Sequence, residues 1–218
     1  MNYSDAQVYV VDGDRETSDA YCGWLEATGL NVTFHRCGES FLREYRPETP
    51  GCVVSELILP DRGAVELLQM TALRPPGIPF IIITAYASVP LAVQAMKAGV
   101  FSFHEKPISE YRLLQSVQTA LDASLAQSKK QAALAAMLRG LDKLSQRERQ
   151  VLDLLAAFQP VKQIAKRLRL SVRTIDYHRA KLLEKLEMGS VPELTHYYLI
   201  SGAATQTSLP EPEIPVVV

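Results

Sequence analysis

Four reactive side chains each stand at or just beyond a short apolar run in the first half of the chain. Asp12 follows QVYVV, Glu56 follows CVVS, Thr84 ends FIIIT, and Lys106 follows VFSFHE. In an open parallel sheet, functional groups gather where the strands end at their carboxyl side. Two carboxylates, a hydroxyl and an ammonium group at such an edge could bind a charged group, and a carboxylate could also attack it.

The elements that must position these side chains alternate between strands and helices. Runs of β-forming residues predict strands at residues 7–11, 31–35, 52–54, 80–84 and 100–103. Helical patterns lie between and after them, near residues 18–29, 38–45, 63–73, 89–98 and 109–125. This alternation predicts an α/β fold, a doubly wound, flavodoxin-like domain with five parallel strands.

The stretch from Leu144 to Leu186 carries side chains suited to binding. Its pattern predicts three successive helices, with a tight turn before Ser171, a good N-cap for the third. One stripe of this third helix is apolar, with Ile175, Leu182, Leu183 and Leu186. The opposite stripe carries Arg173, Asp176, Tyr177, Ala180, Lys181 and Glu184. A helix of about four turns with such a face has the dimensions to enter a major groove.

Charge is divided unevenly along the chain. Residues 1–122 contain 9 Lys and Arg against 15 Asp and Glu, whereas residues 143–200 contain 11 against 6. The net charge is therefore −6 in the first part and +5 in the second. Basic charge concentrated in one domain is typical of a phosphate-binding surface. The acidic first part of the chain indicates a domain that regulates the basic one and does not itself contact DNA.

The second half resembles the helix-turn-helix of the LuxR/NarL/FixJ group of bacterial transcription regulators. The motifs L-S-x-R-E-R-x-V-L, K-x-I-A-K-x-L and S-V-R-T-I-x-x-H-R-x-x-L-x-x-K-L match that family in order and spacing. The resemblance implies an all-α, four-helix domain that binds double-stranded promoter DNA. A fourth helix, VPELTHYYLI at residues 191–200, commonly provides the dimer contact in this family, so a homodimer is expected.

The resemblance also supplies candidate DNA-binding residues. Asp176, Tyr177 and Ala180 occupy the positions from which the family's recognition helix touches base edges, and Asp176 could accept from a cytosine amino group. Asp176 could instead be a solvent-exposed residue that makes no base contact. Tyr177 could instead pack against the preceding helix. The full set is Lys162, Arg173, Thr174, Asp176, Tyr177, His178, Arg179, Ala180, Lys181 and Lys185.

The first half, roughly residues 5–123, resembles the response-regulator receiver domain. The segment ITAYASVPLAVQAMKAGVFSFHEKP is similar to FixJ-like receivers over its full length. Thr84 matches the hydroxyl position, Lys106 the lysine of the Lys-Pro pair, and Phe103 the aromatic switch position. The resemblance therefore implies a site that consists of Asp12, Asp14, Glu56, Thr84, Phe103 and Lys106.

Two positions depart from the receiver pattern. The family places its phosphoryl-accepting aspartate where this chain has Glu56, and a metal-binding acid where it has Gly13. An extra methylene displaces the nucleophile, and positioning supplies much of the catalysis of phosphoryl transfer. Mg²⁺ needs near-octahedral oxygen ligands, so the loss of one carboxylate should weaken its site. We therefore expect a degenerate receiver with no metal and no cofactor. Arg62 is expected to bring a cation near the cluster.

Alternatives remain for the role of Glu56. Its carboxylate could pair with Lys106 or Thr84 and hold the domain near its activated arrangement, or the receiver could be an inactive dimerisation scaffold. A conventional two-component regulator, switched by a histidine kinase, is the other regulator interpretation. A weaker one is an interaction protein that titrates a kinase or another regulator. No nucleophile–base pair or metal cluster appears elsewhere, which argues against an enzyme.

The predicted organisation is a receiver-like domain at residues 1–123, a helical linker at 124–142, a LuxR-type domain at 143–203 and a flexible tail at 204–218. The linker could extend the last receiver helix or form a short dimerising coil. Three scattered cysteines and the lack of a signal peptide or apolar span favour the cytoplasm and no membrane contact. RNA polymerase is a further candidate partner.

Overall fold

The computed structural model describes residues 3–203, so the tail predicted at 204–218 lies outside the described residues. By its internal contacts the chain divides into two compact units, which meet in sequence between Lys129 and Lys130. That division falls within the segment predicted as a linker. Each unit is described below by itself.

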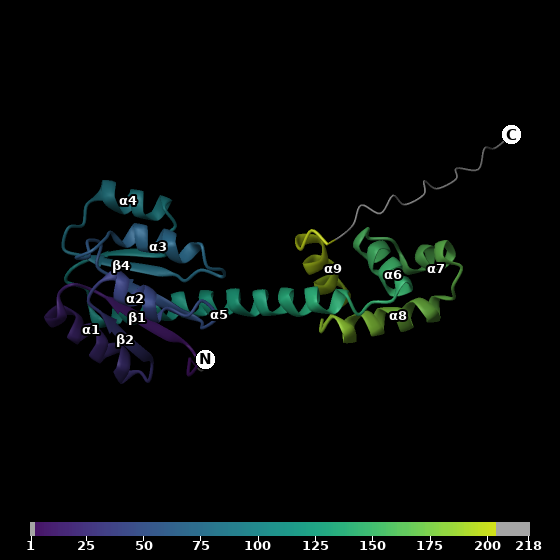
Figure 1. Cartoon of the computed structure of the whole chain (residues 1–218), viewed down its shortest axis with the longest axis horizontal. Coiled ribbons are helices and arrows are strands. Elements are labelled where there is room, and N and C mark those ends of the chain that lie inside the picture. Colours follow the sequence, from purple (N-terminus) through teal and green to yellow (C-terminus); the bar gives the residue numbers. More distant parts are fainter. Residues whose placement is uncertain (1–2, 204–218) are drawn as a thin grey trace. The chain divides into compact units, whose positions relative to one another are not determined.

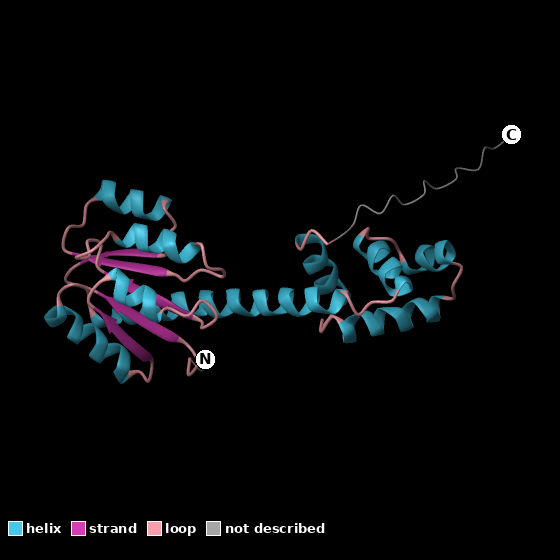
Figure 2. Ribbon diagram, viewed as in Figure 1, coloured by secondary structure: helices cyan, strands magenta, loops and turns pink. Residues whose placement is uncertain are grey.

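The first unit contains a five-stranded, fully parallel sheet, drawn in magenta in Figure 2. Its order is β2-β1-β3-β4-β5, and β1 pairs in register with both β2 and β3. This is the doubly wound topology that the strand–helix alternation predicts. The strands are β1 (Gln7–Val11), β2 (Asn31–His35), β3 (Gly51–Ser55), β4 (Phe80–Thr84) and β5 (Ser102–Glu105).

Helices cover both faces of this sheet, because successive side chains of each strand point to opposite sides. Val8 and Val10 pack in one apolar core with residues of α1 and α5, whereas Tyr9 and Val11 pack in another with residues of α2, α3 and α4. The helices are α1 (Arg15–Ala27), α2 (Gly38–Glu44), α3 (Ala64–Ala72), α4 (Val89–Lys97) and α5 (Glu110–Leu141).

The bounds of α1 and β5 differ from the sequence prediction for reasons that the structure explains. Helix α1 begins at Arg15, three residues early, because the Asp14 side chain accepts from the Glu16 backbone and caps it. Strand β5 covers Ser102–Glu105 and not residues 100–103. Gly99, at φ +98°, turns the chain after α4, and the ladder with β4 starts only at Ser102. The strand therefore ends immediately before Lys106.

The predicted linker is part of one continuous helix. α5 runs for 32 residues, and its first half packs in the sheet core through Leu113, Val117 and Leu121. Its end packs in the core of the second unit through Met137 and Leu141. Of the two interpretations of the linker, the extended last receiver helix matches this arrangement.

The second unit is helical (Figure 1). It has an apolar core of its own. Ile175, Leu182 and Leu186 of the predicted apolar stripe are buried, and Leu183 is half-buried. Ser171 caps α8 by accepting from the Thr174 backbone, as its residue type predicts. The helices that follow α5 are α6 (Gln146–Ala156), α7 (Val161–Leu168), α8 (Val172–Lys185) and α9 (Val191–Ile200).

Gly140 lies where α5 meets the end of α8. A Cβ atom at this position would lie 2.6 Å from the Lys185 carbonyl oxygen and 2.7 Å from Leu186 Cδ2. We expect Gly140→Ala to destabilise the second unit by about 1–3 kcal/mol, since overpacking outweighs the helix propensity that alanine adds. Gly23, inside α1, is the matched control, because a Cβ there meets nothing within 4 Å. Gly23→Ala should stabilise by about 0.5–1 kcal/mol. Urea unfolding of both variants measures the two changes in stability, which should have opposite signs. Changes of the same sign would contradict the close approach of α8 to Gly140.

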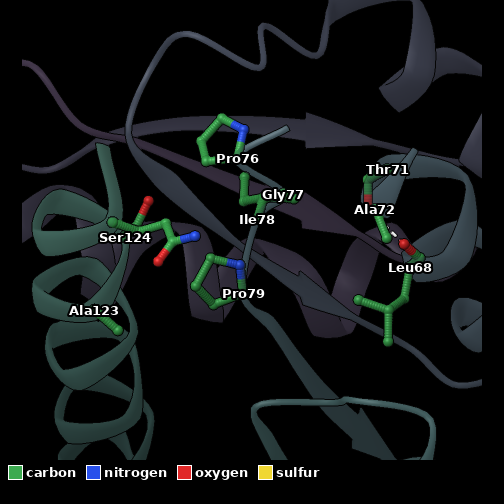
Figure 3. A pocket seen from close by; sticks show the side chains of 10 residues that line it. Leu68, Thr71, Ala72, Pro76, Gly77, Ile78, Pro79, Ala123 and Ser124 are labelled. Atoms are coloured by element: carbon green, nitrogen blue, oxygen red, sulfur yellow. Dashed lines mark hydrogen bonds between the residues drawn. The ribbon is translucent and has the colours of Figure 1, made fainter. Parts of the chain in front are cut away.

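A largely apolar cavity of about 280 Å³ lies at the amino ends of β3 and β4. Figure 3 shows Leu68, Thr71 and Ala72 of α3 and Ala123 and Ser124 of α5 around it. Because the reactive side chains follow the carboxyl ends of the strands, this cavity is separate from them. Among residues 3–203, no helix combines the length and hydropathy needed to cross a bilayer.

Candidate functional site

Parallel strands bring the reactive residues of the first unit together. Val11 lies opposite Ser55 in the register of β1 and β3, so Asp12 and Glu56 leave adjacent strands side by side. Together with Asp14 and Lys106 they line one open pocket of about 520 Å³ at the carboxyl edge of the sheet. The sequence prediction for these four residues therefore agrees with their placement.

Lys106 is held between two carboxylates. Its Nζ lies 2.8 Å from Asp12 Oδ2 and 2.9 Å from Glu56 Oε2, and all three side chains are at most 15% exposed. Burial alone lowers the pKa of Lys106, but its hydrogen bonds to Asp12 and Glu56 outweigh burial and raise the pKa above its usual value. The Lys106 ammonium therefore connects the residues that follow β1 and β3.

Both oxygens of Glu56 are engaged. While Oε2 pairs with Lys106, Oε1 accepts from the Leu57 backbone N–H at 2.8 Å. The extra methylene allows this carboxylate to fold back onto its own loop and still reach the lysine. Of the two partners expected for Glu56, Lys106 is the one found, since the hydroxyl of Thr84 accepts from the Tyr86 backbone at 3.1 Å.

The acids beside Glu56 already have hydrogen-bond partners within the protein. Asp12 Oδ1 accepts from the Asp14 backbone and Oδ2 from Lys106. Asp14 caps α1, and its hydrogen bond from Thr17 lowers the pKa of its carboxyl. Gly13 adds no ligand, and a Cβ there would lie 3.0 Å from the Pro60 ring. Within residues 3–203 no group of three His, Cys, Asp or Glu side chains is placed to hold a metal ion.

The other two receiver residues, Thr84 and Phe103, do not line this pocket. Thr84 ends β4 and is fully buried, and Phe103 of β5 is half-buried against the core that α2, α3 and α4 cover. Arg62 does not join the cluster, contrary to the sequence expectation. Its guanidinium pairs with Asp61 at 3.1 Å and its side chain lies against Gly38, which has no side chain to exclude it.

In the second unit, α8 presents the expected face to solvent. The exposed residues on it are Arg173, Asp176, Tyr177, Ala180 and Glu184, and Tyr177 is 60% exposed. The interpretation of Tyr177 as a packing residue therefore fits poorly. Lys162, at the start of α7, is also exposed. Thr174 and His178 are half-buried, and His178 Nδ1 has no hydrogen-bond partner among the described residues.

Three of the predicted DNA-binding cations have partners inside the unit. Arg179 pairs with Asp176 at 2.8 Å and Lys181 with Glu184 at 2.7 Å, both along α8. Lys185 instead reaches Glu148 of α6 at 2.8 Å. Because Glu148 is buried, this ion pair gives Lys185 a structural role that competes with the predicted DNA contact.

Each half of the chain matches a known protein family. Residues 8–118 match the response regulator receiver domain, and residues 142–198 match the luxR family of bacterial regulatory proteins. The transcriptional regulatory protein FixJ of Azorhizobium caulinodans is 35% identical over 197 residues, which are 90% of this chain and 93% of that protein. The chain is a response regulator of the NarL/FixJ family.

Solved structures of such response regulators cover the same two halves. The response regulator StyR is 31% identical and matches 90% of this chain and 99% of its own with a TM-score of 0.70. Full-length FixJ from B. japonicum is 34% identical and matches 90% of this chain and 97% of its own, with a TM-score of 0.52. The FixJ relatives are transcriptional regulatory proteins and the second half matches the luxR family, so this response regulator is a DNA-binding transcription factor and not an enzyme.

The sequence interpretation of this response regulator missed Glu148. Its carboxylate accepts from the backbone and hydroxyl of Ser145 as well as from Lys185. Ser145 and Glu148 have the S-x-x-E spacing of a capping box, from which the first two bonds could have been predicted. The bond to Lys185, 37 residues away, depends on how α6 packs on α8 and has no local signature.

His35 should make the first unit of this response regulator sensitive to acid. It is 3% exposed at the end of β2, and burial lowers its pKa despite Glu44 at 3.9 Å. A lowered pKa means that its stabilising contribution is present above roughly pH 6.5 and is lost as the pH falls below it. Urea unfolding should show lower stability at about pH 5.5 than at about pH 7.5. In the variant His35→Gln the difference in stability between the two pH values should be smaller. A difference as large as that of the parent would contradict the role of His35.

Proposed function

We propose that this response regulator controls transcription from promoter DNA with a receiver that operates without phosphorylation. The observation that carries the proposal is the Asp12–Lys106–Glu56 bridge, at 2.8 and 2.9 Å. By resemblance to the receiver family, Glu56 stands where the phosphoryl-accepting aspartate is expected. A carboxylate that already holds the lysine there acts as a fixed negative charge.

Three features support this proposal. Glu56 has one oxygen on Lys106 and the other on the Leu57 backbone, so both oxygens are already engaged. Asp12 and Asp14 also have partners within the protein, and Gly13 adds no carboxylate for the Mg²⁺ that would otherwise neutralise the charge in transit. The fixed charge instead supplies the contact to Lys106 that would hold the receiver near its activated arrangement.

For the output, we propose that α8 enters the major groove of double-stranded DNA and that the protein acts as a homodimer in the cytoplasm. Exposed Arg173, Asp176, Tyr177 and Ala180 would face the groove, and Lys162 would face a phosphate. α9 exposes Leu199 and Ile200, 43% and 58%, which supports its role in the dimer contact. RNA polymerase would be the partner in activation.

Incubation with acetyl phosphate and Mg²⁺ tests the receiver. We expect intact-mass spectrometry to show no phosphate adduct, while a receiver known to accept phosphate is labelled in the same reaction. The expectation follows from the geometry, because misplacement of a nucleophile by about 1 Å can cost roughly 100-fold in rate. A stoichiometric, acid-labile adduct on Glu56 would overturn the proposal.

That adduct would instead favour the second candidate, a conventional regulator switched by a histidine kinase. One observation keeps this candidate in view: Asp12, Asp14 and Glu56 all line the same open pocket, so a phosphodonor could reach them. Labelling that Glu56→Gln abolishes would establish it.

A further inference from the structure

The two acids on the solvent-facing side of α8 each hold a cation of the same helix. Asp176 Oδ1 lies 2.8 Å from Arg179, and Glu184 Oε2 lies 2.7 Å from Lys181. Within residues 3–203, Arg173 is the cation of this face with no ion-pair partner. α8 therefore presents far less free positive charge than its composition suggests.

Arg179 differs from a freely moving surface arginine. Its side chain is 34% exposed, and its Nε is buried with no hydrogen-bond partner among the described residues. The stem is thus held against the unit, and the end of the guanidinium is directed at Asp176. Removing the Asp176 charge would release that end toward solvent, where a phosphate could bind it.

We infer that Asp176 is a specificity-determining residue that lowers the affinity for non-cognate DNA by holding Arg179 away from phosphates. On a non-cognate duplex its carboxylate faces a polyanion and gains no donor. At a cognate site a cytosine or adenine amino group in the major groove donates to the carboxylate and replaces the arginine. Exposed ion pairs are weak, so this exchange costs little. The inference rests on the proposed placement of α8 in the groove.

The test measures the affinity of the full chain for two duplexes over a range of salt concentrations. One duplex is the sequence that in vitro selection on the parent protein yields, and the other is its scrambled counterpart. For Asp176→Asn we expect roughly fivefold tighter binding to the scrambled duplex and a salt slope steeper by about 0.9, the value of one added phosphate contact. The preference for the selected duplex should fall by about tenfold.

Two controls separate this effect from a change in net charge or in folding. Asp142→Asn removes the same charge from an exposed position outside α8 and should leave the preference unchanged. Asp176→Asn combined with Arg179→Gln should return the salt slope to that of the parent. If Asp176→Asn weakens binding to the selected duplex without tightening binding to the scrambled one, Asp176 only reads a base and the inference is wrong.

The same data distinguish failure of the inference from failure of the proposed function. A parent protein that prefers no duplex at any salt concentration overturns the proposed placement of α8. A parent with a clear preference that Asp176→Asn leaves intact overturns only the role of Asp176.

Discussion

Replacing Glu148 with glutamine should destabilise the second unit by about 3 kcal/mol at neutral pH. Burial alone raises the pKa of Glu148, but the hydrogen bonds from Lys185 and Ser145 outweigh it and lower the pKa to about 2. The carboxylate is 8% exposed, so glutamine leaves the Lys185 ammonium partly buried beside a neutral amide. Loss of the pair should loosen α6 from α8, the helix proposed to bind DNA.

The pH dependence follows from the same pKa. A folded-state pKa of about 2, against an ordinary 4.5, gives a contribution that is complete above pH 4.5 and is lost as the pH falls toward 2. Hydrogen exchange of the α6 and α8 amides measures the local stability directly. Glu184→Gln is the matched control, because the exposed Glu184–Lys181 pair on the same helix should matter little. Equal protection in Glu148→Gln and the parent would contradict the prediction.

Replacing Glu56 with alanine should weaken binding to the selected DNA duplex by roughly tenfold, a usual size for coupling between sites. Alanine leaves Lys106 with Asp12 alone and removes the proposed fixed charge. Glu56→Gln should act in the same direction, because the amide has nearly the same shape and no charge. Glu56→Asp should fall between, since its shorter side chain keeps the charge but reaches less far toward the lysine.

Two comparisons make this prediction specific to the bridge. Glu66→Ala removes one acid from the exposed side of α3 and should leave DNA affinity unchanged. Lys106→Ala should reproduce the loss, and the double variant should be no worse than either single one, since both remove the same contact. If Glu56→Ala binds DNA as well as the parent, the receiver is an inactive scaffold and Glu56 is not a mimic of phosphate.

Local sequence determined the fold class and most of the elements. Apolar runs such as QVYVV and FIIIT define β1 and β4, and the strand–helix alternation specifies the parallel sheet. The parallel arrangement brings Asp12, Glu56 and Lys106 to one edge, because each follows the carboxyl end of a strand. In the second unit, the apolar spacing and the Ser171 cap define α8.

The sequence predictions were wrong where a contact between residues far apart in sequence overrides the local structural preference of the chain. The start of β5 depends on pairing with β4, which begins at Ser102, although Val100 and Phe101 are equally good strand formers. Arg62 comes shortly after Glu56 in sequence, but its side chain lies against Gly38 and pairs with the Asp61 carboxylate. Gly140 lies one residue before the end of α5, where its lack of a side chain allows α8 to approach closely.

The sequence by itself therefore determined which residues this response regulator brings to its receiver edge and which face of α8 it exposes, because the periods of strands and helices fix both. The tertiary structure decided how those residues are paired. Glu56 with Lys106 and Lys185 with Glu148 each depend on distances of a few ångströms that side-chain packing sets. Charge pairing falls steeply with distance and rises with burial, so these partners follow from the fold and not from the order of residues.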